Sequence, residues 1–257
     1  MQSLLRTVPA GFLAAAVILS AAACGSAGSG ASGASQTPAA SPLAGLTADQ
    51  IAQQALKDLR AASSVQISGR VPSQQGNVAF DITDVAPATC KGTIVLTPTA
   101  ASAGTSESVT IGIIQVHGIA YLKPSRSYLE YLHAPAWMYP EVNGKYIKST
   151  SDAALADMSK VCDLQSMVGL FTQGGTGFVK ASSATFGGRA ALILNQPYAR
   201  PANTMYVSDS ATPQFLDIQQ TAEPGVFIDF DNFNAPVAIA APPAANIAKL
   251  TGGESLD

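Results

Sequence analysis

Residues 108–123 read Ser-Val-Thr-Ile-Gly-Ile-Ile-Gln-Val-His-Gly-Ile-Ala-Tyr-Leu-Lys. Two strand-like segments, 108–116 and 119–123, flank the dipeptide His117-Gly118. Glycine readily adopts the positive φ that a two-residue hairpin needs, so the dipeptide predicts a tight turn. The stretch therefore predicts a β-hairpin of two antiparallel strands.

Strand-like segments also make up most of the rest of the chain. Further strands are predicted at about residues 65–71, 78–82, 93–97, 144–148, 178–184, 189–195, 204–208, 215–221 and 226–230. Helices are predicted at about 48–61, from about 151 to the glycines at 174–177, and at 244–250. Because hairpins rather than long crossovers join the strands, we expect an α+β fold with a large curved antiparallel β-sheet, or half-barrel, whose one face is covered by helices. Ile113 and Ile114 are adjacent and both apolar, so their strand is expected to be covered on both faces.

The N-terminus has the pattern of an export signal. Arg6 precedes an uncharged apolar run that ends in small alanines directly before Cys24. This pattern predicts a lipoprotein signal peptide over residues 1–23, acylation of Cys24 with a palmitate-type chain, and anchoring at the extracytoplasmic face of the cell membrane. The alternative is an ordinary secretory signal with an incidental Cys24. Residues 24–45 are rich in Gly, Ser, Ala and Pro and predict a flexible tether, which leaves 46–251 as a single β-rich domain.

The sequence carries no complete catalytic signature. The chain has 14 Lys and Arg against 17 Asp and Glu, so it lacks the cationic surplus that nucleic acid requires. Its two histidines, His117 and His133, have no partners at metal-ligand spacing. Asp229 and Asp231 share a strand face, which we interpret as a solvated face rather than a catalytic pair. We expect a protein that is not an enzyme, with no cofactor and no metal.

Cys90 and Cys162 remain after Cys24 is assigned to the anchor. An even number of cysteines in an exported chain favours a disulfide between them. Two buried free thiols are the alternative.

The chain is rich in apolar side chains, with 47% hydrophobic and only 12% charged residues. One interpretation is a sheet curved around a hydrophobic cavity that takes a lipid or glycolipid. Its candidate lining residues are Ile111, Ile113, Tyr121, Trp137, Leu164, Met167, Val168 and Phe171. The other interpretation is a packed interaction or sensing module, in which the irregular aromatic segment 125–142 binds another envelope protein of unknown identity. An alanine-rich composition accounts for part of the apolar content.

Three segments together give the sequence a family resemblance. They are the Ala23-Cys24 junction with its tether, the stretch Leu46-Thr-Ala-Asp-Gln-Ile51 leading into Ser64-Val-Gln-Ile-Ser-Gly69, and Gln115-Val-His-Gly-Ile-Ala-Tyr-Leu-Lys123. With these, the chain resembles the actinobacterial LppX/LprG-type lipoproteins, whose curved sheet is similar to that of the LolA and LolB carriers. The resemblance covers most of residues 46–250. It implies a carrier of acylated glycolipids or other lipids within the cell envelope.

Overall fold

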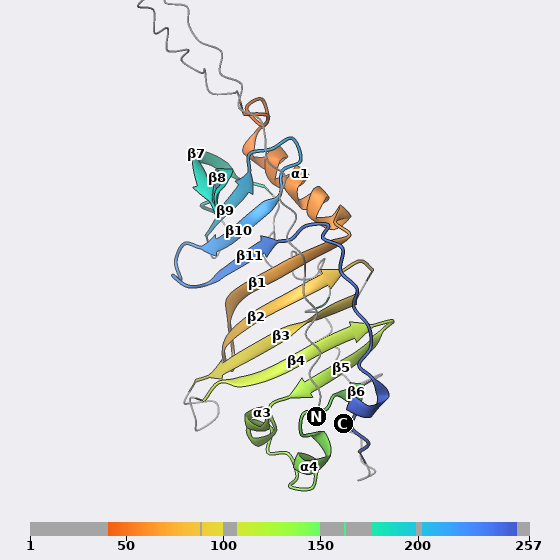
Figure 1. Cartoon of the computed structure of the whole chain (residues 1–257). Coiled ribbons are helices and arrows are strands. Elements are labelled where there is room, and N and C mark those ends of the chain that lie inside the picture. Colours follow the sequence, from red (N-terminus) through yellow and green to blue (C-terminus); the bar gives the residue numbers. More distant parts are fainter. Residues whose placement is uncertain are drawn as a thin grey trace, which may run out of the picture. The chain divides into compact units, whose positions relative to one another are not determined.

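The computed structural model describes residues 41–87, 89–99, 107–149, 162, 176–198 and 202–250 (Figure 1). Its helices are α1 (Ala48–Ala61), α3 (Arg126–Tyr131), α4 (Met138–Val142) and the short 3-10 helix η2 (Ala244–Asn246). The strands of the first half are β1 (Ser64–Ser73), β2 (Gly76–Val85), β3 (Thr89–Pro98), β4 (Val109–Val116), β5 (Ile119–Pro124) and β6 (Ile147–Ser149). Those of the second half are β7 (Val179–Phe186), β8 (Arg189–Gln196), β9 (Asn203–Ser208), β10 (Phe215–Gln220) and β11 (Phe227–Asp231).

All these strands form one open antiparallel sheet, in the order β6-β5-β4-β3-β2-β1-β11-β10-β9-β8-β7. Strands β1 to β6 and strands β7 to β11 are two meanders, each built from neighbours in sequence. The last strand, β11, pairs with the first, β1, and this pairing joins the two meanders, as Figure 1 shows. The predicted α+β class with a large curved antiparallel sheet is confirmed.

The hairpin and the first helix form as their local sequences predict. His117 and Gly118 adopt φ values of 53° and 72°, which is the positive-φ pair of a tight two-residue turn. In α1, Thr47 accepts a hydrogen bond from the amide of Gln50, and the Gln50 side chain accepts from the amide of Thr47. This capping box satisfies two amides that the first turn leaves without helical partners.

One face of the sheet, which we call the apolar face, carries the main hydrophobic core. Side chains from both meanders contribute to it, among them Ile67, Ile82, Ile113, Met205 and Ile228. Helix α1 packs onto this face with its own buried residues and contacts β7, β9 and β10. The expected helical cover is thus present at the β7–β10 part of the face, whereas the helix predicted from residue 151 lies outside the described residues.

Two glycines on the apolar face allow neighbouring strands to approach closely. A Cβ added at Gly92 would lie 2.2 Å from the Asp81 carbonyl oxygen, and one added at Gly69 would lie 2.5 Å from the Phe227 carbonyl oxygen. In a sheet that curls, the side chains on the inner side converge, so residues without a Cβ relieve crowding there. We infer that these glycines permit the curvature toward the apolar face.

We call the opposite face the outer face and the C-terminal segment 232–250 the strap. Ile239 and Ile247 of the strap pack against the outer-face cluster of Ile114, Val116 and Tyr121. Asn234 donates its amide to the Ser64 carbonyl at one end, and at the other Tyr146 and Ile247 form a parallel bridge. In Figure 1 the strap runs from β11 past the ends of several strands to β6. The helix predicted over 244–250 is wrong apart from the turn at η2, because Asn246 and Ala248 form backbone hydrogen bonds with Tyr146 instead of continuing a helix.

The segment 125–142 is more regular than its sequence indicated. It forms α3 and α4 instead of an irregular loop, and Leu129, Met138 and Val142 from these helices make a small separate core. Pro140 is tolerated because it lies in the first turn of α4, where its missing amide would have no helical acceptor.

Candidate functional site

The apolar face is the part of the structure that fits a hydrophobic ligand by its chemistry. Ile111 and Ile113 lie side by side in β4 on this face, and both are buried in the main core. Leu122 of β5 pairs with Ile113 in register and joins the same core. Alternation along β4 places Ile114 on the outer face, where it packs with Val116. The prediction that β4 is covered on both faces is confirmed.

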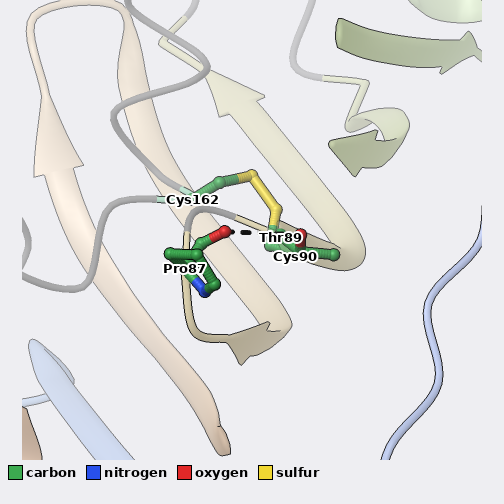
Figure 2. Close-up of a disulfide and its surroundings, with 4 residues drawn as sticks. All are labelled: Pro87, Thr89, Cys90 and Cys162. Carbon is green, nitrogen blue, oxygen red and sulfur yellow. Dashed lines mark hydrogen bonds between the residues drawn. A yellow bond between two sulfur atoms is a disulfide. The ribbon is translucent and has the colours of Figure 1, made fainter. Parts of the chain in front are cut away.

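A disulfide fixes a distant part of the chain against the apolar face. Cys90 of β3 and Cys162 are bonded, with their Cα atoms 5.4 Å apart and a separation of 72 residues in sequence (Figure 2). Both cysteines are buried and belong to the main core. Beside them, Thr89 donates its hydroxyl to the Pro87 carbonyl at 3.5 Å. The expected bond is present, and it holds residue 162 against the apolar face near the start of β3.

The remaining candidates of the cavity are not brought together in the described structure. Tyr121 alternates with Leu122 and therefore faces the other way, where it packs against Ile114 and is covered by Ile247 of the strap. Trp137 precedes α4 and is 40% exposed, in the segment that also carries the exposed Leu132. Leu164, Met167, Val168 and Phe171 lie outside the described residues, as does Cys24. Ile111 and Ile113 are thus the two candidates that the described structure places on one surface.

The cover of Tyr121 is a feature that the sequence analysis missed. Successive side chains of β5 face opposite sides of the sheet. Because Leu122 pairs with Ile113 in the hairpin, its neighbour Tyr121 lies on the face opposite to Ile113. The apolar residues Ile239 and Ile247 in the strap were the available signal, because an extended tract with isolated apolar residues needs a surface to pack on.

A small hollow adjoins the segment 125–142. A cavity of about 220 Å³ lies between Pro124, Arg126, Leu129 and Tyr139. The Arg126 Cζ atom lies 5.7 Å from the centroid of the Tyr139 ring, and Arg126 Nε forms an ion pair with Glu130 Oε1 at 2.8 Å. The most exposed apolar residue of the segment, Leu132, lies outside the lining of that hollow.

The described residues also bear on metal binding and on membrane crossing. Among them, no group of three or more His, Cys, Asp or Glu side chains is arranged to hold a metal ion. Within the same residues, no helix has the length and apolar character needed to span a membrane.

The chain is similar in fold to several solved structures. LprF from Mycobacterium bovis, a lipoprotein of the LppX/LprG type, matches with a TM-score of 0.50 and 15% identity, covering 76% of this chain and 96% of LprF. An uncharacterized conserved protein from Thermus thermophilus matches with a TM-score of 0.34 and 13% identity, over 78% of this chain and 98% of that one. A chain of the Pseudomonas aeruginosa MucA/MucB complex matches with a TM-score of 0.31 and 13% identity, over 77% and 59%.

No protein-family model matches the chain, and no curated protein sequence does either. At 15% identity the likeness to LprF concerns the fold. The resemblance to LppX/LprG-type lipoproteins is confirmed at that level.

Proposed function

We propose that the chain is an envelope lipoprotein that binds or carries a hydrophobic ligand, a lipid or glycolipid, between its sheet and the helices on the apolar face. Residues 1–23 serve as its signal peptide and 24–45 as a tether. An acylated Cys24 anchors the domain of residues 46–251 to the extracytoplasmic face of the cell membrane. The protein acts by binding and releasing its ligand and not by chemical catalysis.

The single observation that carries the proposal is the disulfide between Cys90 and Cys162. It holds residue 162 against the apolar face at β3, while α1 covers the same face at β7, β9 and β10. In this proposal the sequence stripe Leu164, Met167, Val168 and Phe171, which begins two residues after Cys162, supplies one wall of the site, and Ile111 and Ile113 belong to its floor.

Burial of acyl chains supplies the affinity in this proposal. Each methylene group removed from water contributes about 0.8 kcal/mol. A site walled by aliphatic side chains on an open sheet selects for chain length and bulk more than for a head group. The fold shared with LprF supports the proposal, since the same type of curved sheet is found in a lipoprotein.

The test starts with mass spectrometry of lipid extracts from the intact, tagless protein. We expect lipid at a defined molar ratio after removal of detergent. Ile113→Ala and Ile114→Ala form a matched pair, because the same residue type is removed at adjacent positions on opposite faces. Ile114→Ala should lower the free energy of unfolding by about 2 to 5 kcal/mol and leave the bound lipid unchanged.

In the proposed carrier the Ile113 side chain borders the ligand, so Ile113→Ala should cost less stability than Ile114→Ala and should change the acyl chain lengths that are retained. Phe171→Ala should behave in the same way, whereas in a packed core it would cost about 3 to 5 kcal/mol. A parent protein without lipid, together with a full packing loss in Ile113→Ala and Phe171→Ala, would contradict the carrier function. The exposed Leu132 and Trp137 of segment 125–142 would then favour the interaction module instead.

A further inference from the structure

A hollow of about 460 Å³ lies on the outer face at the β10–β11 hairpin, away from the apolar face. Two carboxyl side chains, Asp217 of β10 and Asp229 of β11, line it, and Phe186 and Phe227 supply its aromatic walls. We call it the carboxyl pocket. Its volume falls in the range of about 300 to 1,000 Å³ that is usual for small-molecule sites.

The two carboxyls are brought together by the register of the sheet. Asp217 and Asp229 are directly opposite each other in the β10–β11 ladder, and their side chains are hydrogen-bonded to each other. Asp217 is only 1% exposed, and its Oδ1 atom has no hydrogen-bond partner. Asp229 is partly exposed above it. A buried carboxyl oxygen without a donor is costly unless something else supplies one.

The negative charge of this pair is not balanced from within the pocket. None of the described residues that line it is a Lys, Arg or His. Arg189 of β8, which pairs in register with Phe186, forms an ion pair with Asp231 at 3.1 Å, and Arg70, opposite Phe227 in β1, is exposed. Burial and the neighbouring Asp229 raise the pKa of Asp217 to about 8, which is the response of a carboxyl that lacks a positive partner.

Aromatic rings complete the pocket in a way that favours a particular kind of cation. The ring centroids of Phe186 and Tyr206 are 5.0 Å apart. Phe227 lies two residues before Asp229, on the same face of β11. Ring faces attract an ammonium or guanidinium group, whereas a small metal ion would need more oxygen ligands than two carboxyls provide.

We propose that the carboxyl pocket binds an organic cation, an ammonium or guanidinium group that contacts Asp229 and the buried Asp217 and lies against the rings of Phe186 and Phe227. The cation supplies the positive charge that the pair lacks and a hydrogen bond to Asp217 Oδ1, in addition to the one that Asp217 receives from the Gln219 side chain. The site is separate from the proposed lipid site, because Asp217 and Asp229 lie on the outer face.

Calorimetric titration of the intact protein tests this directly. The probes are n-butylammonium chloride and ethylguanidinium chloride, each compared with sodium chloride at the same ionic strength. We expect saturable binding of at least one organic cation. The titrations are run at pH 9, where Asp217 is ionised, and there Asp217→Asn and Asp229→Asn should each weaken binding at least tenfold, while the matched control Asp231→Asn on the same strand should change it less than twofold.

A capped Ala-Arg-Ala tripeptide and its Lys counterpart distinguish the sources of the cation. Binding of a tripeptide at least tenfold tighter than the small cations supports a side chain of another protein as the ligand, and equal or weaker binding supports a free small molecule. Heat produced equally by sodium chloride would overturn the proposal, as would an equal loss in Asp231→Asn. Lipid co-purification is measured on the same samples, so a failure of this proposal is seen separately from a failure of the carrier function.

Discussion

Asp217 shows how a single residue can set a property of the whole domain. It lies between Leu216 and Ile218 in a strand whose other members are largely buried. The aspartate pairs with Asp229 across the strands, and not with a cation. Burial disfavours its charged form, so the folded protein holds a proton at this carboxyl well above the pH at which an aspartate usually releases it.

We predict that this proton makes stability depend on pH. The pKa of Asp217 is about 8 in the folded protein and about 3.9 in an unfolded chain. Between these values the folded state binds more protons, so the free energy of unfolding should fall as the pH rises from about 5 to about 8. Asp217→Asn mimics the protonated form and should flatten this decline.

Urea unfolding of both proteins at pH 5, 6.5, 8 and 9 provides the measurement. The difference between the parent and Asp217→Asn isolates the contribution of this carboxyl from other titrating groups, of which Asp229 and Tyr206 are its partners in the ladder. Parallel curves for the two proteins would show that Asp217 is ionised in the folded state throughout the range.

At the scale of elements, the sheet depends on two glycines that occupy strand interiors. Gly69 lies in β1 opposite Phe80 and Ile228, and Gly92 lies in β3 opposite Ile82. Glycine weakens a strand by its backbone entropy, so its presence in such positions needs a compensating gain. The close approach of the neighbouring backbones is that gain.

We predict that Gly92→Ala lowers the free energy of unfolding by about 1 to 3 kcal/mol, because the new methyl group would force β2 and β3 apart. Gly112→Ala in β4 is the matched control. A Cβ there meets its nearest atom, Lys123 Cβ, at an ordinary 3.4 Å, so the change should be neutral or slightly stabilising. Chemical denaturation of both variants makes the comparison, and equal effects would mean that Gly92 does not relieve crowding.

At the scale of the whole molecule, long-range contacts hold the domain together. The β1–β11 pairing joins two meanders, the strap links the β1 region to β6, and the Cys90–Cys162 bond ties a remote residue to the core. Outside these contacts, the proposed tether and anchor place the domain at a membrane surface.

We predict that Cys24→Ser releases the protein from the membrane. A Cys24→Ser chain that is cut as an ordinary secretory signal carries no acyl chain and should be released, whereas an uncleaved chain is recognised by its larger mass. Fractionation after a high-salt wash, with labelling by a palmitate analogue, measures retention and acylation together. Cys90→Ser is the control, since it removes a cysteine without touching the anchor and should keep both. A mature-sized Cys24→Ser protein that stays bound after the wash would contradict the anchor.

Local sequence alone was sufficient for most of the elements and the class of fold. The capping box at Thr47 and Gln50 and the turn at His117-Gly118 depend on contacts within a few residues, so they can be recognised from spacing. Alternation within β4 likewise determined that Ile113 and Ile114 face opposite ways. The cysteine count indicated the disulfide, because two thiols in an exported chain offer one pairing.

Only the tertiary structure decided which distant residues meet. The strap over Tyr121 and the pairing of β1 with β11 depend on contacts between segments more than 100 residues apart, for which no local signal exists. The carboxyl pair is the clearest case: Asp229 and Asp231 share a strand, yet the register places Asp229 opposite Asp217 and leaves Asp231 to Arg189. A charge inside the run Phe215-Leu-Asp-Ile218 was visible in the sequence, but its partner followed from strand pairing alone.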